Sequence, residues 1–186
     1  MVVLFNDVLP LAHGQVTLVS ADDHDLVSHA EATTGQANGL CGAAVAGHLH
    51  LVIGTDTGDV PFRIELFDTE PVLDAAAPGP DAPWEDIVEV SFRPETDVVA
   101  LVSTEGETDD LELPVADYRV RFCARGMDAA AIDDTVPSGE ATRDRYALQL
   151  WPAPFAPDAV IRVSTRAAAS WHHEATLTAE QRAARD

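Results

Sequence analysis

Apolar and polar residues alternate over several short runs of this sequence, and a two-residue period is typical of β-strands with one buried face. The clearest run is residues 87–93, in which Val88, Val90 and Phe92 share one face. Glutamate, serine and arginine take the other face. Pro94 ends the run because proline cannot donate a hydrogen bond to a neighbouring strand. The run therefore predicts a half-buried strand.

Two further runs follow, and with the first they predict three consecutive antiparallel strands, a meander. Residues 98–103 are continuously apolar, which is typical of a more buried strand, and the polar residues 104–110 are expected to turn the chain. In residues 117–125 the alternation returns, with Tyr118 and Phe122 facing inward. The residues expected on the solvent face of this strand are Arg119, Arg121, Cys123 and Arg125.

Five more strands and two short helical segments complete the pattern. The strands are predicted at residues 15–20, 47–54, 60–67, 146–151 and 159–164. Residues 47–54 and 60–67 are close enough in sequence to form a hairpin, with His48 and His50 on its outer face. One short helix is expected around residues 127–132, and Thr178 with Gln181 forms a capping pattern near the C-terminus.

Seven to nine short strands, proline-rich connections and little helix predict an all-β fold, an antiparallel β-sandwich. We expect one domain over residues 1–170, because a chain of this length can bury a single large core. Residues 171–186 are expected to be a C-terminal tail that can form a short helix. Residues 1–7 lack the basic start of an export signal, and no apolar run reaches the roughly 20 residues of a membrane helix. These features predict a soluble, cytoplasmic protein.

The charge of the chain is strongly negative and unevenly distributed. It holds 32 acidic residues, 11 arginines and no lysine. Residues 1–118 contain 23 of the acidic residues but only Arg63 and Arg93, so the whole excess lies in this part. We expect no direct binding to nucleic acid, because affinity for phosphate backbones comes from clustered basic residues. A basic protein is the natural partner.

Two side-chain patterns could carry chemistry, and each has a simpler explanation. His48 and His50 could present two imidazoles to a metal, with His13 or the pair at residues 172–173 as a third ligand, but no glutamate follows at the cupin spacing. A pair of solvent-facing histidines is the commoner arrangement, so we expect no metal. The arginine stripe at 119, 121 and 125 could bind an anion. Ordinary cross-strand pairs with acidic residues are favoured; the candidates are Glu65, Glu89 and Glu112.

No catalytic or cofactor motif is present. The sequence contains neither a Gly-x-Ser-x-Gly elbow nor a phosphate-binding loop. The acidic turns around Asp22 and Asp56 lack the full ligand series of a calcium loop. Cys41 and Cys123 are too far apart in sequence for a metal finger and are expected to be reduced. We therefore expect no enzyme activity and no cofactor.

Acidic residues beside an aromatic side chain are a reasonable composition for a protein contact surface. Residues 84–86 combine a tryptophan with two acidic residues, and residues 105–110 are predicted to form an acidic loop. The residues expected to contact the partner are Trp84, Glu85, Asp86, Glu105, Glu107, Asp109 and Asp110.

Residues 111–123 also resemble a strand start found in a known family. Their Leu-Pro and following tyrosine look like the Leu-Pro-x-Gly-x-Tyr pattern of the competence protein J (ComJ)-like inhibitors of DNA-entry nucleases, and residues 13–18 resemble the first strand of that family. Ala116 departs from the pattern, which has glycine there. The resemblance implies a small acidic β-sandwich that blocks a nuclease, and it implies no catalytic residue.

The leading hypothesis is an acidic binding protein that inhibits a basic partner such as a nuclease or nuclease toxin. The alternative is a β-sandwich ligand-binding or accessory domain without an inhibitory role. The sequence does not indicate the oligomeric state.

Overall fold

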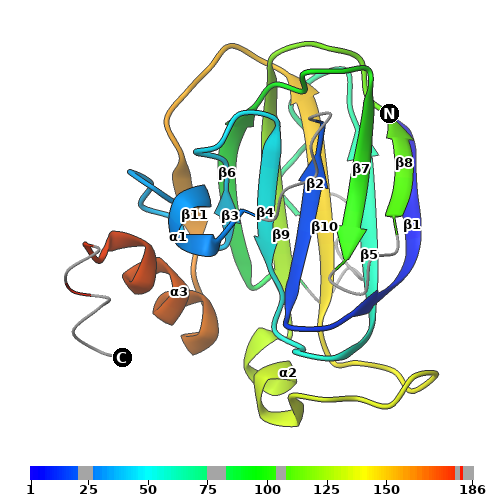
Figure 1. The fold of residues 1–186 in the computed structure, drawn as a ribbon, viewed down its shortest axis with the longest axis vertical. Helices are drawn as coiled ribbons and strands as arrows, with labels where there is room; N and C mark the ends of the chain where they lie inside the picture. Colours follow the sequence, from blue (N-terminus) through cyan, green and yellow to red (C-terminus); the bar gives the residue numbers. More distant parts are fainter. Residues whose placement is uncertain (21–26, 75–82, 104–107, 179–180, 182–186) are drawn as a thin grey trace.

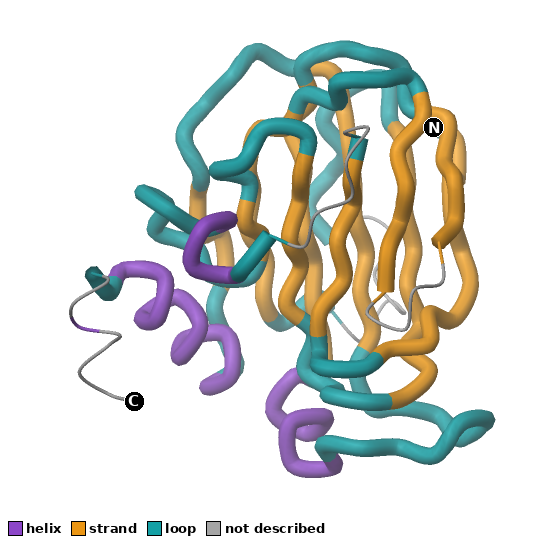
Figure 2. The backbone as a smooth tube through the Cα atoms, in the orientation of Figure 1, coloured by secondary structure: helices purple, strands orange, loops and turns teal. Residues whose placement is uncertain are grey.

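The computed structural model describes residues 1–20, 27–74, 83–103, 108–178 and 181, and it consists mainly of two β-sheets packed face to face (Figure 1). The helices lie outside this sandwich, beside one edge and at one end of it (Figure 2). The predicted all-β class is therefore confirmed.

Sheet A has six strands and is mixed. All its neighbours are antiparallel except β5 and β10, which run parallel. In spatial order its strands are β1 (Val2–Leu11), β5 (Gly58–Leu66), β10 (Arg145–Pro152), β9 (Tyr118–Arg125), β6 (Asp86–Phe92) and β11 (Ala159–Arg162).

Sheet B has five strands and lies in front of sheet A in Figure 1. Its pairs are all antiparallel. In spatial order its strands are β3 (Cys41–Gly42), β4 (His48–Val52), β2 (Gln15–Val19), β7 (Val98–Ser103) and β8 (Thr108–Glu112).

Three helices are described: α1 (His29–Ala32), α2 (Met127–Asp133) and α3 (Arg166–Thr176). Among the described residues, no helix is long and apolar enough to span a membrane. Helix α1 begins with a capping box in which Ser28 and Glu31 bind each other's backbone amides. The hydroxyl of Thr165 accepts a hydrogen bond from the amide of Ala168 and caps α3 in the same way.

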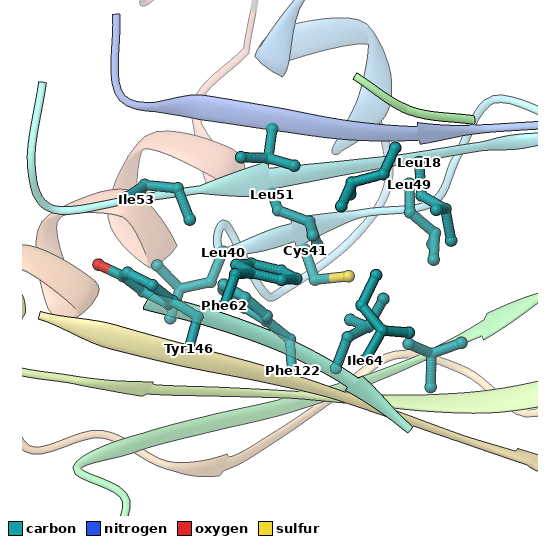
Figure 3. Packing of buried hydrophobic residues seen from close by; sticks show 14 of the residues in the cluster. Leu18, Leu40, Cys41, Leu49, Leu51, Ile53, Phe62, Ile64, Phe122 and Tyr146 are labelled. Carbon is teal, nitrogen blue, oxygen red and sulfur yellow. The ribbon is translucent and has the colours of Figure 1, made fainter. Parts of the chain in front are cut away.

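The core lies between the two sheets, and side chains from both meet there (Figure 3). Sheet A contributes a run of stacked aromatic rings. The rings of Phe122 and Tyr146 have centroids 5.6 Å apart and are nearly parallel, and the ring of Phe62 lies 6.3 Å from that of Tyr146. Leu18, Leu49 and Leu51 face these rings from sheet B in Figure 3. The alternation of the sequence thus places apolar residues of both sheets in one core.

A hydrogen-bond network closes the core at the start of β10. The hydroxyl of Tyr146 donates to the carboxylate of Asp144 and accepts from the amide of Gly54, both at 2.7 Å. The amide and hydroxyl of Thr55 donate to the same carboxylate. Asp144 is therefore fully satisfied although it is buried.

The start of β9 explains the Leu-Pro pattern seen in the sequence. Leu113 is fully buried, and the hydroxyl of Tyr118 donates a 2.9 Å hydrogen bond to the carbonyl of Pro114. The tyrosine thereby ties the strand to the turn that precedes it, as in the tyrosine corners of other β-sandwiches.

The predicted strands are all present, but two predicted pairings are wrong. Strands β6 and β9 pair in sheet A, whereas β7, between them in sequence, belongs to sheet B, so there is no meander. Strands β4 and β5 likewise lie in different sheets and form no hairpin. Alternation shows which face of a strand is buried, and it has the same form in either sheet.

The sequence analysis also missed three strands and helix α1. The described strands number eleven, two more than the upper expectation, and the additional ones are β1, β3 and β8. A short helix was expected within residues 171–186, and helix α3 begins earlier, at Arg166, and runs across residue 170. The expected capping pair does form, because the amides of Thr178 and Gln181 donate to each other's side chains. Helix α2 confirms the short helix expected there.

Replacing Phe122 with alanine should lower the free energy of unfolding by about 3–5 kcal/mol, because it removes a fully buried ring from the centre of the core. Urea denaturation followed by circular dichroism measures this loss. Val115→Ala is the control, since this exposed residue should change stability by less than about 0.5 kcal/mol. Similar small losses in both variants would contradict the described packing.

Candidate partner-binding surface

Two of the three arginines of β9 are buried, so the prediction that Arg119 and Arg121 face solvent is wrong, whereas Arg125 is half-buried. Arg119 is 7% exposed and Arg121 is 2% exposed. The loops after β5 and after β10 cover them. The carbonyl of Pro71 accepts from Arg121 Nη1 at 2.9 Å, and the carbonyls of Ala156 and Pro157 accept from Arg119 Nη1 at 3.1 and 2.8 Å. Loop carbonyls therefore replace water as partners of both guanidinium groups.

Glu89 on β6 neutralises both arginines across the strand pair. Its Oε2 accepts from Arg119 Nε at 3.1 Å, and its Oε1 accepts from Arg121 Nε at 2.9 Å. The Arg121 guanidinium also lies 5.0 Å from the centre of the Trp151 ring, a cation–π contact. The expected cross-strand pairing with Glu89 is confirmed. Glu65 instead pairs with Arg63 of its own strand, and Glu112 lies in the other sheet.

Most other described arginines are held in the same way by carboxylates of this chain. These pairs are Arg93–Asp117, Arg125–Glu85, Arg143–Asp133, Arg162–Asp74 and Arg166–Asp128. The Arg162 pair is bidentate, with distances of 2.7 and 3.0 Å to the two oxygens of Asp74. Because these arginines pair with carboxylates of the chain, most of the unpaired charges among the described residues are negative.

Two of the expected contact residues are buried. Trp84 is 3% exposed and packs on Ile87, Cys123 and Ala147 on the outer face of sheet A. Asp86 is 0% exposed and begins β6, so the prediction that it lies in a loop is wrong. Its carboxylate accepts hydrogen bonds from the amides of Ser164 and Thr165 and from the Thr165 hydroxyl, and so fixes the chain just before α3. In this conformation neither side chain offers a surface to a partner.

Glu85 is half-buried and also has internal partners. Its carboxylate accepts a 2.8 Å hydrogen bond from the amide of Gly126 and lies 3.7 Å from Arg125. Glu105 and Glu107 lie outside the described residues. The segment around Trp84 is thus a structural joint between β6, β9 and the start of α2.

The other two expected residues lie on the edge of the sandwich. Asp109 and Asp110 are exposed on β8, an edge strand of sheet B, and Glu112 on the same strand is exposed as well. We call these three residues the acidic edge. Within the described part of the chain, no arginine lies within salt-bridge distance of them. Charged residues on an edge strand also discourage unwanted pairing with other chains.

Strand β1, the edge of sheet A, lies beside β8, and the two are neighbours in Figure 1. It carries an exposed apolar strip that consists of Met1, Val2, Val3 and Val8. Exposed apolar residues rimmed by charge are a common composition for a protein contact site. The sequence analysis missed β1 because Asn6 and Asp7 interrupt its apolar run.

The histidines of β4 are buried as well, so the prediction of a solvent-facing pair is wrong. His50 is 1% exposed, and its ring centroid lies 5.8 Å from that of His29 on α1. The His29 ring in turn lies 4.8 Å from Trp171 on α3. Burial lowers the pKa of His50 to about 4, and the neighbouring His29 adds to this shift. Within the described residues, no group of three potential ligands is placed to hold a metal ion.

Both cysteines are free, as expected, and both are buried, so the prediction that Cys123 faces solvent is wrong. Burial raises the pKa of the Cys41 and Cys123 thiols, which disfavours the reactive thiolate. These thiols therefore act as small apolar core groups.

Comparison with known proteins identifies the fold. No protein-family model matches the sequence, and no curated protein matches it. The fold is similar to that of ComJ from Bacillus subtilis, described as an inhibitor of the DNA-degrading activity of NucA. The TM-score is 0.53 at 16% identity, over 82% of this chain and 98% of ComJ. The product of crocagin biosynthetic gene J gives a TM-score of 0.48 at 15% identity, over 80% and 96%. The resemblance seen in residues 13–18 and 111–123 is thus confirmed at the level of the fold.

Replacing Glu89 with glutamine should destabilise the protein by about 3–5 kcal/mol, because two buried guanidinium groups lose their shared carboxylate. Chemical denaturation measures this difference. The matched control is Asp117→Asn, which breaks an exposed pair with Arg93 and should cost less than about 1 kcal/mol. Equal losses in the two variants would show that the buried pairs contribute no more to stability than the exposed pair.

Stability should fall as the pH is lowered from 6.5 toward 4. The unfolded chain protonates His50 near pH 6.5, whereas the folded chain resists until about pH 4, so acid favours the unfolded state in this interval. The expected contribution is roughly 3 kcal/mol. His50→Leu should flatten the slope of unfolding free energy against pH, and His173→Gln, at an exposed position of α3, should leave it unchanged. An unchanged slope in His50→Leu would contradict this assignment.

Proposed function

We propose that this chain is an acidic binding protein of the inhibitor or immunity type, which neutralises a basic partner, a nuclease or nuclease toxin. One observation carries the proposal: most of the described arginines pair with carboxylates of the chain, so a large excess of negative charge is left without internal partners. The similarity of the fold to a nuclease inhibitor supports the choice of partner. The chain itself is proposed to have no catalytic role.

The acidic edge is the proposed contact surface. A nuclease binds phosphates through clustered basic residues, and Asp109, Asp110 and Glu112 offer such a cleft a row of carboxylates. Glu105 and Glu107, which lie between β7 and β8 in the sequence, remain part of the proposal. The exposed apolar strip of β1 replaces Trp84 as the apolar part of the contact. Long-range attraction would then guide the encounter.

The alternative, a ligand-binding domain without an inhibitory role, is favoured by one feature. A hollow on the outer face of sheet A contains arginine side chains. This hollow lies on β1, β5 and β10, whereas the acidic edge lies on β8, and the two functions do not exclude each other.

Association with a nuclease encoded beside this chain should be fast at low salt and should slow steeply as sodium chloride is added. Surface plasmon resonance across a salt series measures this, together with inhibition of DNA cleavage. Asp110→Asn combined with Glu112→Gln should lower the association rate about tenfold, as expected when steering charges are removed.

The control pair Asp134→Asn with Glu140→Gln removes the same charge from exposed positions far along the chain from β8 and should have a smaller effect. Equal effects of both pairs would remove the acidic edge as the contact surface. A rate independent of salt would remove the electrostatic mechanism. Failure to bind or inhibit any such nuclease would favour the ligand-binding alternative.

A further inference from the structure

A hollow of about 320 Å³ lies on the outer face of sheet A, where β1, β5 and β10 run side by side. This is within the size range of small-molecule sites, about 300–1,000 Å³. Its lining combines two cationic side chains with several apolar ones, and it shares only Val8 with the proposed contact surface. The residues on which the argument depends are Asp7, Val8, Pro61, Arg63, Trp84 and Arg145.

Arg145 has an unusual position in this very acidic chain. Every other arginine of the described residues lies within 4.0 Å of a carboxylate, and Arg145 does not. Instead, the register of β10 and β9 places it directly opposite Arg125. Like charges opposite each other on neighbouring strands destabilise a sheet. Arg125 is compensated by Glu85 and by the carbonyl of Pro83, so the uncompensated positive charge is that of Arg145.

Arg63 brings a second guanidinium group to the same hollow. It lies opposite Ala147, two residues along β10 from Arg145. Its Nε and Nη2 bind Oε1 of Glu65 at 2.8 and 2.7 Å. Among the described residues, its Nη1 has no hydrogen-bond partner. One anion between Arg63 and Arg145 would therefore satisfy donors that the chain itself leaves unused.

The remaining walls limit what the anion can be. Pro61 and Val8 provide exposed apolar surface beside the two arginines, to which the nearly buried Trp84 adds little, and this surface suits a flat apolar group. Asp7 lines the hollow from β1, and its Oδ1 accepts a hydrogen bond from the amide of Val8. This carboxylate and the net charge of −21 oppose ligands with many negative charges. The chemistry therefore favours a single oxyanion and excludes nucleic acid.

We propose that this hollow binds a small molecule in which one oxyanion, a carboxylate or a phosphate, is attached to a flat apolar group. Arg145 and Arg63 hold the oxyanion, for which the planar guanidinium fork is well suited. The apolar group lies against Pro61 and Val8. Binding also relieves the repulsion between Arg145 and Arg125. The inference does not depend on nuclease inhibition.

Isothermal titration calorimetry with benzoate, phenyl phosphate, inorganic phosphate and the neutral benzamide tests the site. Both aromatic anions should bind more tightly than inorganic phosphate and benzamide, and the tighter of the two identifies the preferred oxyanion. Arg145→Gln should weaken binding of that anion by about tenfold or more, the usual effect of losing a charged hydrogen bond.

The matched control is Arg143→Gln, two residues earlier, which removes an exposed arginine that pairs with Asp133 and does not line the hollow. It should leave the affinity unchanged. Without ligand, Arg145→Gln should unfold at no lower temperature than the wild type, because it removes a like-charge contact. Failure of both aromatic anions to bind, equal affinity in wild type and Arg145→Gln, or a lower melting temperature of that variant would each overturn the proposal.

Discussion

The structure depends on the neutralisation of two buried arginines, which share the carboxylate of Glu89, while Arg121 also pairs with Glu70 at 2.9 Å. Sheet A is covered on both faces, and its outer cover consists of loops that lie over Arg119 and Arg121. Removing a guanidinium group from water costs several kcal/mol unless its charge and its donors find partners. Glu89 supplies the charge, and the loop carbonyls supply the remaining acceptors. The same contacts that neutralise the arginines therefore hold the loops against the sheet.

This arrangement also determines which charged groups lie at the surface of the protein. Arg119 and Arg121 on the outer face of sheet A are internal groups, and carboxylates such as those of β8 are surface groups. Asp86 and Asp144 are exceptions, since both are buried and satisfied by hydrogen bonds that join distant segments. A count of charges along the sequence describes the total correctly, but only the fold shows which sign remains in contact with solvent.

Fold class followed from the sequence because alternation reports which residues of a strand face the core. Pairing did not follow, since neither the alternating run at residues 87–92 nor the apolar run at residues 98–103 indicates that the two strands belong to opposite sheets. Strand β8 was missed because Leu111 is its only apolar residue. The exposure of Asp109 and Asp110 could be predicted from their chemistry, whereas the burial of Asp86 depends on Thr165, far away in the sequence.

The parallel pair of β5 and β10 has a consequence for the synthesis of the chain. These neighbours at the centre of sheet A are separated by residues 67–144, so β5 is without its inner partner until β10 has left the ribosome. Contacts between such distant segments form late and leave apolar strands uncovered in the meantime. Residues 1–118, which are synthesised before β10, also carry the entire excess of negative charge. Mutual repulsion of these carboxylates keeps unfinished chains apart while their strands remain unpaired.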